Sequence, residues 1–211
     1  MTRQHLIERI LRQVYGDQPR DDSSITYLLV NEWMNTGIGI AAKQNYKEAI
    51  QLDGIGYVNN SFYTTFKGLE VEPDESFKWK ITLPQLPFGI GRNEGIATLQ
   101  FKDANNKVSL PCIPLSENQK GYYQRMRPIP NVILFYPEGT FLYALSTIIL
   151  SNYTATVGMI SGGNANDLSS VLNIPDDYIA TVIDYCTKML MLERAQPVDA
   201  ANDGLDAIKT T

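Results

Sequence analysis

The sequence is poor in the residues that most often perform catalysis or bind metals, with one histidine and two cysteines among 211 residues. His5 lies in an N-terminal helical pattern, and its neighbours offer no serine or cysteine triad. Cys112 and Cys186 match no zinc-ligand spacing, and two buried free thiols are more consistent with this spacing than a disulfide. We therefore expect no catalytic residues, no metal and no cofactor.

Long apolar runs and an excess of basic residues are also missing. No stretch of about 18 apolar residues occurs, and charges interrupt the apolar positions of the N-terminus, so we expect neither a membrane span nor a signal peptide. The net charge is −5, and lysine and arginine are scattered. This distribution argues against a dedicated surface for nucleic acid or for anionic lipid. We expect synthesis in a cytoplasm and no membrane partner.

Two further patterns give no chemical site. The G-x-G pairs in "TGIGI", "DGIGY" and "FGIGRNEG" are not followed by G-K-[ST], so we expect flexible turns there and no phosphate loop. A cluster of carboxylates matches no EF-hand loop and predicts a solvated acidic turn, in preference to an acid–base pair or a calcium site. This cluster comprises Glu70, Glu72, Asp74 and Glu75.

Helical patterns occupy both ends of the sequence. Apolar residues from Leu6 to Val14 predict a short amphipathic helix that stops at Gly16. A second helix is predicted from a cap in "DDSSI", through Ile25 to Ala49, with a kink or break at "TGIGI" because a helical glycine costs up to ~1 kcal/mol. Pro175 and two aspartates favour the start of a last helix that Pro197 closes. Its apolar face would comprise Ile179, Val182, Ile183, Cys186, Met189 and Leu190.

Between residues 56 and 160 the apolar period changes to two, which is typical of strands. Phe77, Trp79, Ile81 and Leu83 would share one face of a strand in "FKWKITL". Residues 96–101 should form a hairpin with Val108 and Leu110, and "NVILFY" should form another with "FLYALS" around "PEGT". "YTATVGMI" predicts a further strand. The Pro-rich "PCIPLSENQKGYYQRMRPIP" should break the pairing and form an extended arm.

Aromatic residues in and beside the second hairpin have two interpretations. Their alternation favours packing within a sheet, while a platform for a sugar or a base is the alternative. These residues are Tyr122, Tyr123, Phe135, Tyr136, Phe141 and Tyr143.

We predict an α+β fold in which N- and C-terminal helices form a helical body with an inserted antiparallel β domain. Residues 1–55 would be the N-terminal helical part, 56–160 the β domain with its arm, and 161–211 the last helix and a tail, all in one composite domain. After Pro197 the tail has only three larger aliphatic residues, which are too few to order it alone. We expect this tail to dock on a partner.

The order of several segments resembles the ring or head-to-tail connector proteins of crAss-like tailed bacteriophages. These segments are "RDDSSITYLLVNEW", "LPCIPL", "MRPIP", "NVILFYPEGTFLYAL" and "IPDDYIATVIDYCTKMLMLERAQPVDAANDG". In outline they are similar to the tail tubular, or gatekeeper, connectors of short-tailed phages. The resemblance covers nearly the whole chain, and its most specific part is the C-terminal segment.

The resemblance implies a virion structural protein of the neck or tail, made in the host bacterial cytoplasm. It implies a homo-oligomeric ring of about twelve subunits below the portal, in contact with the portal and with neighbouring ring or tail proteins. DNA would pass through without sequence-specific binding. The subunit interface is expected to include Pro197, Val198, Leu205, Ile208, Tyr122, Tyr123, Arg125 and Arg127.

From the residues alone, a different class of function also stays open. A non-enzymatic β-rich module that binds carbohydrate or a host receptor in a phage tail is the alternative, and a small hydrolase is a third possibility.

Overall fold

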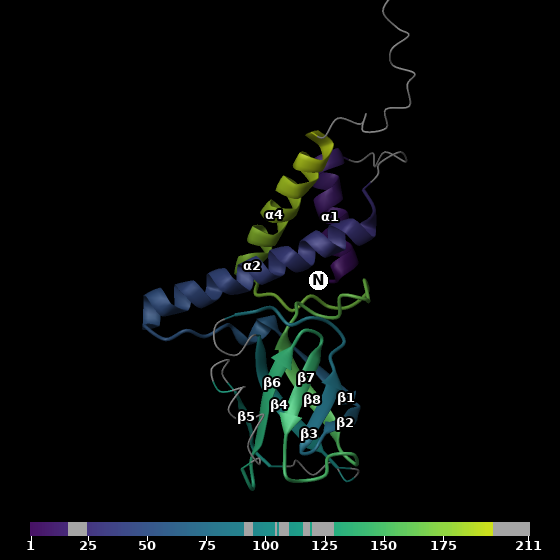
Figure 1. The fold of residues 1–211 in the computed structure, drawn as a ribbon. Coiled ribbons are helices and arrows are strands. Elements are labelled where there is room, and N and C mark those ends of the chain that lie inside the picture. The colour runs from purple at the N-terminus through teal and green to yellow at the C-terminus, as the bar shows by residue number, and fades with distance from the viewer. Residues whose placement is uncertain are drawn as a thin grey trace, which may run out of the picture.

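The structure is a computed structural model that describes residues 1–16, 25–90, 95–103, 105, 110–115, 119 and 129–195 (Figure 1). This part of the chain contains three α-helices, a 3-10 turn and eight strands in two sheets. Figure 1 shows the helices gathered at one end of the molecule and the strands at the other. The prediction of a chain that mixes helices with mainly antiparallel strands is confirmed.

Helix α1 spans Arg3–Tyr15, and its capping residues explain both of its ends. The hydroxyl of Thr2 accepts a hydrogen bond from the His5 N–H at the start. Gly16, with φ of 71°, donates its N–H to the carbonyl of Arg12 at the end. The predicted stop at Gly16 is therefore confirmed. The fully buried residues of this helix include Leu6, Ile7 and Ile10.

Helix α2, Tyr27–Asp53, runs through the "TGIGI" segment as one helix of 27 residues. The predicted kink or break there is wrong, because Figure 1 shows the helix passing this point without a bend. The helix begins after Thr26, whose hydroxyl accepts from the Leu29 N–H, so Ile25 precedes it. The predicted cap at 21–24 lies outside the described residues. At 1.5 Å per residue the helix is about 40 Å long.

Gly37 and Gly39 permit close packing of α2 against its neighbours. A Cβ atom at Gly37 would lie 3.3 Å from side-chain atoms of both Val182 and Tyr185 in helix α4, Asp176–Ala195. A Cβ atom at Gly39 would lie 3.0 Å from the ring of Phe88. The two glycines face different directions on the helix, so α2 receives α4 on one side and the Phe88 segment on another. This packing offsets their low helix propensity.

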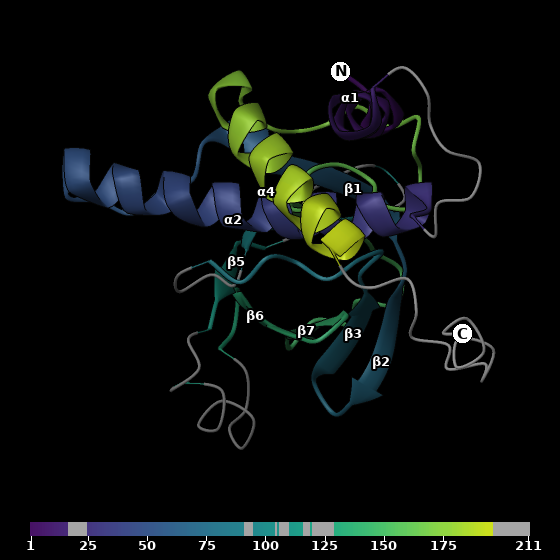
Figure 2. The ribbon, with the colours of Figure 1, turned by 90° about the horizontal axis from the view of Figure 1, so that it is seen from above.

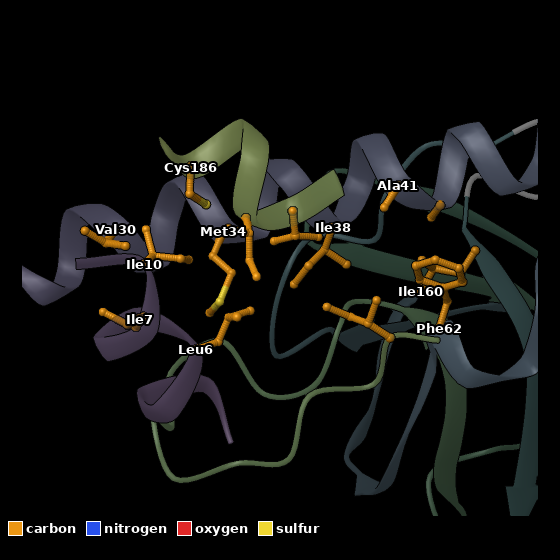
Figure 3. Packing of buried hydrophobic residues seen from close by; sticks show 14 of the residues in the cluster. Leu6, Ile7, Ile10, Val30, Met34, Ile38, Ala41, Phe62, Ile160 and Cys186 are labelled. Atoms are coloured by element: carbon orange, nitrogen blue, oxygen red, sulfur yellow. The ribbon is translucent and has the colours of Figure 1, made fainter. Parts of the chain in front are cut away.

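Helix α4 forms the predicted apolar face. Asp176 and Asp177 stand in its first turn, after Pro175. Val182, Ile183, Cys186 and Leu190 are buried, and Ile179 and Met189 are partly buried. Figure 3 shows Cys186 with Met34 of α2 and Ile10 of α1 in one core. At its other side this core reaches Phe62, in the 3-10 turn Asn60–Phe62, and Ile160.

The strands form two sheets that share a second core. The first sheet has the order β1 (Tyr63–Leu69), β8 (Thr154–Ile160), β4 (Ile96–Lys102). The second has the order β2 (Val71–Glu75), β3 (Lys78–Thr82), β7 (Phe141–Leu145), β6 (Ile133–Glu138), β5 (Cys112–Pro114). Trp79 and Leu142 of the second sheet and Leu99 and Val157 of the first belong to this core. Because both sheets contribute to one core, they face each other.

The structure confirms part of the predicted strand pairing. The strand in "FKWKITL", the β6–β7 hairpin and the strand β8 are found where predicted. The first strand of the hairpin predicted from 96–101 is found as β4, and its partner in the structure is β8. Leu110 lies in no strand, and Val108 lies outside the described residues.

The Pro-rich segment contributes a strand where an interruption was predicted. Cys112–Pro114 form β5, which pairs with β6 in parallel. β5 is at one end of the described strand order, and an edge strand tolerates proline because one side of its backbone needs no partner. The prediction of an arm free of pairing is therefore wrong for these residues, and 116–118 and 120–128 lie outside the described residues.

The start of the chain is fixed by a buried arginine. Arg3 is fully buried and donates hydrogen bonds to the side-chain oxygens of Asn31 and Asn35, each at 2.6 Å, and to the Gly162 carbonyl at 3.5 Å. Burial lowers the pKa of Arg3 to about 10. Its backbone N–H also donates to the Ser170 carbonyl at 3.1 Å. Arg3 thus ties α1 to α2 and to the segment between β8 and α4.

The close packing at Gly37 predicts that a larger side chain at this position lowers the stability of the protein. The Gly37→Leu substitution should lower the free energy of unfolding by about 1–3 kcal/mol or more, because its side chain overpacks the contact with α4. Thr36→Leu, one residue away and exposed, is the control and should change the free energy of unfolding by less than about 0.5 kcal/mol. Urea unfolding followed by circular dichroism measures both. Equal midpoints for the two variants would contradict this account of the glycine.

Candidate interaction surfaces

The second half of α2 projects beyond the other helices (Figure 2). Its last contact with α4 is a polar one, in which the side-chain amide of Asn45 donates to the Tyr178 hydroxyl at 3.1 Å and that hydroxyl donates to the Glu48 carboxylate. The hydrogen bond from Tyr178, with a second from Gln44, lowers the pKa of Glu48. These bonds hold the projecting half in line with the rest of the helix.

The projecting end carries four exposed apolar side chains, which we call the α2 tip. They are Ile50, Leu52, Ile55 and Tyr57, with exposed fractions of 43%, 84%, 69% and 50%. The Tyr57 hydroxyl donates to the Asp53 carboxylate at 2.9 Å, and this bond holds the ring against the end of the helix. Four large apolar side chains within eight residues form the kind of exposed patch that marks an interaction site.

A cavity of about 240 Å³ opens beside the α2 tip. The described residues of its lining carry no charged side chain, and they are Tyr46, Gly56, Tyr57, Val58, Tyr63, Ile90, Gly95, Ile96 and Ile160. Residues 91–94, between Ile90 and Gly95, lie outside the described residues. A Cβ atom at Gly56 would lie 2.3 Å from the Tyr46 ring, so glycine lets that ring lie against the backbone. Burial raises the pKa of Tyr63, which keeps its phenol neutral. The described lining therefore combines uncharged phenol rings with aliphatic side chains and backbone.

The other end of α2 carries a separate pair of exposed apolar residues, which we call the α2 start. They are Tyr27 and Leu28, with exposed fractions of 46% and 67%. Met191 and Leu192, in the last turns of α4, are also exposed. Figure 2 shows these last turns far from the projecting end of α2. One helix thus presents unlike apolar surfaces at its two ends.

A third exposed apolar surface, which we call the distal β end, lies where the strands point away from the helices. It comprises Phe77, Ile129, Ile148 and Ile149. Phe77 lies in the β2–β3 turn with φ of 63°, and its carbonyl accepts from the Ser146 N–H at 3.0 Å. The prediction that Phe77 shares the inner face of its strand is therefore wrong. A positive φ in a bulky residue is rare and often accompanies function.

The carboxylates predicted to form a solvated acidic turn are exposed, as predicted, but they lie on and beside the edge strand β2, so the prediction of a turn is wrong. Asp74 pairs with Lys78 at 2.7 Å and Glu72 with Lys80 at 3.4 Å across the β2–β3 hairpin. Pro73 and these charges block pairing with another strand edge. Within the described ranges, no group of three or more His, Cys, Asp or Glu residues could hold a metal ion.

The residues considered for chemistry lie apart from one another. His5 is exposed on α1. Cys112 and Cys186 are free, as predicted, although Cys112 is only half-buried. Burial raises the pKa of each thiol to about 12, so both stay protonated at neutral pH.

The aromatic residues of the β6–β7 hairpin are packed within the sheet. Phe135 and Tyr136 are buried, and the ring centroids of Tyr136 and Tyr143 are 5.4 Å apart. Of the two interpretations from the sequence, this confirms sheet packing for these residues.

The predicted interface residues all lie outside the described residues. These are Tyr122, Tyr123, Arg125, Arg127, Pro197, Val198, Leu205 and Ile208. Sequence reasoning missed the α2 tip instead. The periodicity gave no signal for it, because Leu52 continues the helical stripe that contains Met34, Ile38 and Ala41, and Ile55 follows the end of the helix.

Comparison with protein-family models and with curated proteins gives no match to this chain. None of the helices that the structure describes combines the length and the apolar character that crossing a membrane requires.

The raised thiol pKa values predict slow alkylation of the folded protein. With iodoacetamide at pH 8, neither cysteine should react appreciably, because the thiolate is the nucleophile and both thiols are protonated in the folded state. In urea both should be labelled, which intact mass spectrometry counts. Stability should also fall as the pH rises above about 9, where thiols of the unfolded chain ionise first. Rapid labelling of the native protein would contradict this prediction.

Proposed function

We propose that this chain is a structural subunit of a head-to-tail connector ring in the neck or tail of a tailed bacteriophage. The observation that carries the proposal is the pair of unlike apolar surfaces at opposite ends of α2. A head-to-tail contact joins two different surfaces on neighbouring copies, and it closes into a ring when the rotation between copies allows. A two-fold dimer would instead use one surface twice.

The separation of the helices from the strands, at opposite ends of the molecule, suits a connector subunit. In the proposed arrangement the helices form a body that meets the neighbours in the ring, and the β domain is inserted between them in the sequence. A connector also stacks on other rings, and the distal β end offers an apolar surface directed away from the helices for that purpose. The portal and neighbouring ring or tail proteins are the partners that we propose.

The charge of the chain is compatible with a channel through which DNA slides. The net charge is −5, and lysine and arginine are scattered along the sequence. Phosphate contacts from a cluster of basic residues would bind DNA tightly and would slow its passage. The proposal therefore includes DNA that passes without sequence-specific binding, through a ring of about twelve subunits in the virion.

The tail from Pro197 to Thr211 is assigned a role in assembly. Burial of Val198, Leu205 and Ile208 would contribute roughly 1.5–3 kcal/mol each, whereas ordering about fifteen residues costs on the order of 15–30 kcal/mol. A surface on a neighbouring subunit would supply the missing contacts. A binding module for carbohydrate is less favoured, because the aromatic residues of β6 are buried in the sheet.

The ring proposal predicts a discrete large oligomer. Size-exclusion chromatography with light scattering on the purified chain should give one mass many times that of the 23.7 kDa monomer, or a mass that rises with concentration to a plateau. Negative-stain electron microscopy of that fraction should then show closed rings. A protein that stays monomeric at every concentration and at low salt would overturn the proposal of self-assembly.

The proposed role of the tail predicts that its removal prevents assembly but leaves the thermal stability of the subunit almost unchanged. A chain that ends at Gln196 should melt within a few degrees of the full-length protein, because the tail cannot contribute much to the fold of its own subunit. The same chain should fail to enter virions in a complementation assay. Incorporation at the normal level would remove the tail from the interface.

A further inference from the structure

We propose that residues 161–165, which follow β8, form a clasp that fixes the angle between the helices and the strands, and that Gln85 is the positioning residue that closes it. We call α1, α2 and α4 the helical half of the molecule and the two sheets the strand half. Figure 1 shows the chain after β8 passing between these two halves. The inference concerns a single subunit, so it goes beyond the proposed function and does not depend on it.

Among the described residues, the strand half makes four hydrogen bonds to the backbone of the clasp. Three come from the side-chain amide of Gln85. Its Nε2 donates to the carbonyls of Ser161 at 3.2 Å and Gly163 at 3.0 Å, and its Oε1 accepts from the Ala165 N–H at 2.9 Å. The fourth comes from β1, where the Thr64 hydroxyl accepts from the Gly163 N–H at 2.9 Å. One glutamine thus holds the clasp at three points, as a neighbouring strand would.

Gln85 is fixed to the strand half by its own segment. It lies three residues after the end of β3, and Leu83 between them is buried in the core that the two sheets share. Pro84 and Pro87 stand on either side of Gln85 and restrict the backbone, because the proline ring fixes φ. The position of the Gln85 amide therefore follows the position of the sheets.

The helical half makes hydrogen bonds to the same five residues. The carbonyl of Gly162 accepts from the Arg3 guanidinium at 3.5 Å, and the carbonyl of Ala165 accepts from the side-chain amide of Asn31 at 2.9 Å. Arg3 also donates to the Asn31 side-chain oxygen at 2.6 Å, so α1 and α2 act on the clasp together. The clasp is therefore bonded to both halves of the molecule along its length.

Two consecutive glycines let the clasp lie this close to its neighbours. Gly162 and Gly163 have φ of 63° and 99°. A Cβ atom at Gly162 would lie 2.6 Å from the side chain of Ile38 in α2, and one at Gly163 would lie 2.7 Å from the Val171 carbonyl oxygen. Without the hydrogen bonds these glycines would act as a hinge, because they accept large changes of φ and ψ.

Directional bonds are required here because apolar contact alone leaves the angle between the halves loosely set. Phe62 and Ile160, next to β1 and at the end of β8, belong to the same core as Met34 and Ile38 of α2. Such contact is non-directional, whereas a hydrogen bond requires an aligned donor and acceptor. Apolar contact therefore holds the two halves together, and the clasp fixes their angle. The α2 tip and the distal β end consequently keep one relative position.

The test measures this angle through the distance between two spin labels. Lys188→Cys on α4 and Thr154→Cys at the start of β8 place one label on each half, at exposed positions. Double electron–electron resonance gives the distribution of distances, with labelled chains diluted in unlabelled ones to exclude contacts between copies. The native cysteines should stay unlabelled because both thiols are protonated at neutral pH, and the wild-type chain measures the background.

Gln85→Met keeps the length of the side chain and removes its three bonds to the clasp. The two labels should then show a second distance, or a distribution at least about twice as wide, because the hinge is released. Hydrogen exchange followed by mass spectrometry should show the amides of residues 161–165 exchanging at least about tenfold faster. Thr64→Val, which removes the acceptor of the Gly163 N–H, should change both measurements in the same direction.

Two controls separate this role from a general contribution to stability. Gln100→Met makes the same substitution at an exposed position of β4 and should change neither measurement. Leu99→Ala, in the core of the sheets, should lower the unfolding midpoint and leave the distance distribution unchanged. A wild-type distribution in folded Gln85→Met would overturn the inference, and so would equal broadening in Leu99→Ala. If Gln85→Met does not fold, a wild-type distribution in Thr64→Val overturns it instead.

Discussion

The close approach of two segments to the middle of α2 is the constraint on which the rest of the molecule depends. Gly37 lets α4 rest against one side of the helix, and Gly39 lets the ring of Phe88 rest against another. Held from both directions, α2 continues as one helix through a point where its own propensity is lowest. Its second half therefore projects from the body, and the α2 tip and the cavity exist because it does.

The sequence predicted those parts of the fold whose causes are local. Gly16 ends α1, the periodic apolar residues of α4 are buried, and the β6–β7 hairpin forms around a tight turn, because each depends on residues a few positions apart. The failures share a different cause. The helix persists at Gly37 because of contacts with α4, and β4 finds its partner in β8, more than fifty residues later in the chain. Local patterns carry no information about such partners.

The candidate surfaces were harder to predict than the fold, for a related reason. Leucine and isoleucine are typical core residues, and Leu52 and Ile55 are exposed only because α2 projects from the body. The cavity is assembled from α2, the segment after it, β1 and the ends of β4 and β8, so no single stretch of sequence signals it. The sequence-based expectation placed the interface in the tail and the Pro-rich arm, which lie outside the described residues.

The hydrogen bonds of Arg3 impose an order on how a new chain matures. Arg3 and Gly162 are 159 residues apart, so the first helix emerges from the ribosome long before its partner segment exists. The core that supports α2 also needs α4, the last described helix to be made. A nascent chain therefore lacks the complete core around α2 until α4 has been synthesised. Until then the apolar faces of α1 and α2 stay partly exposed, and the incomplete chain is most prone to aggregate in that interval.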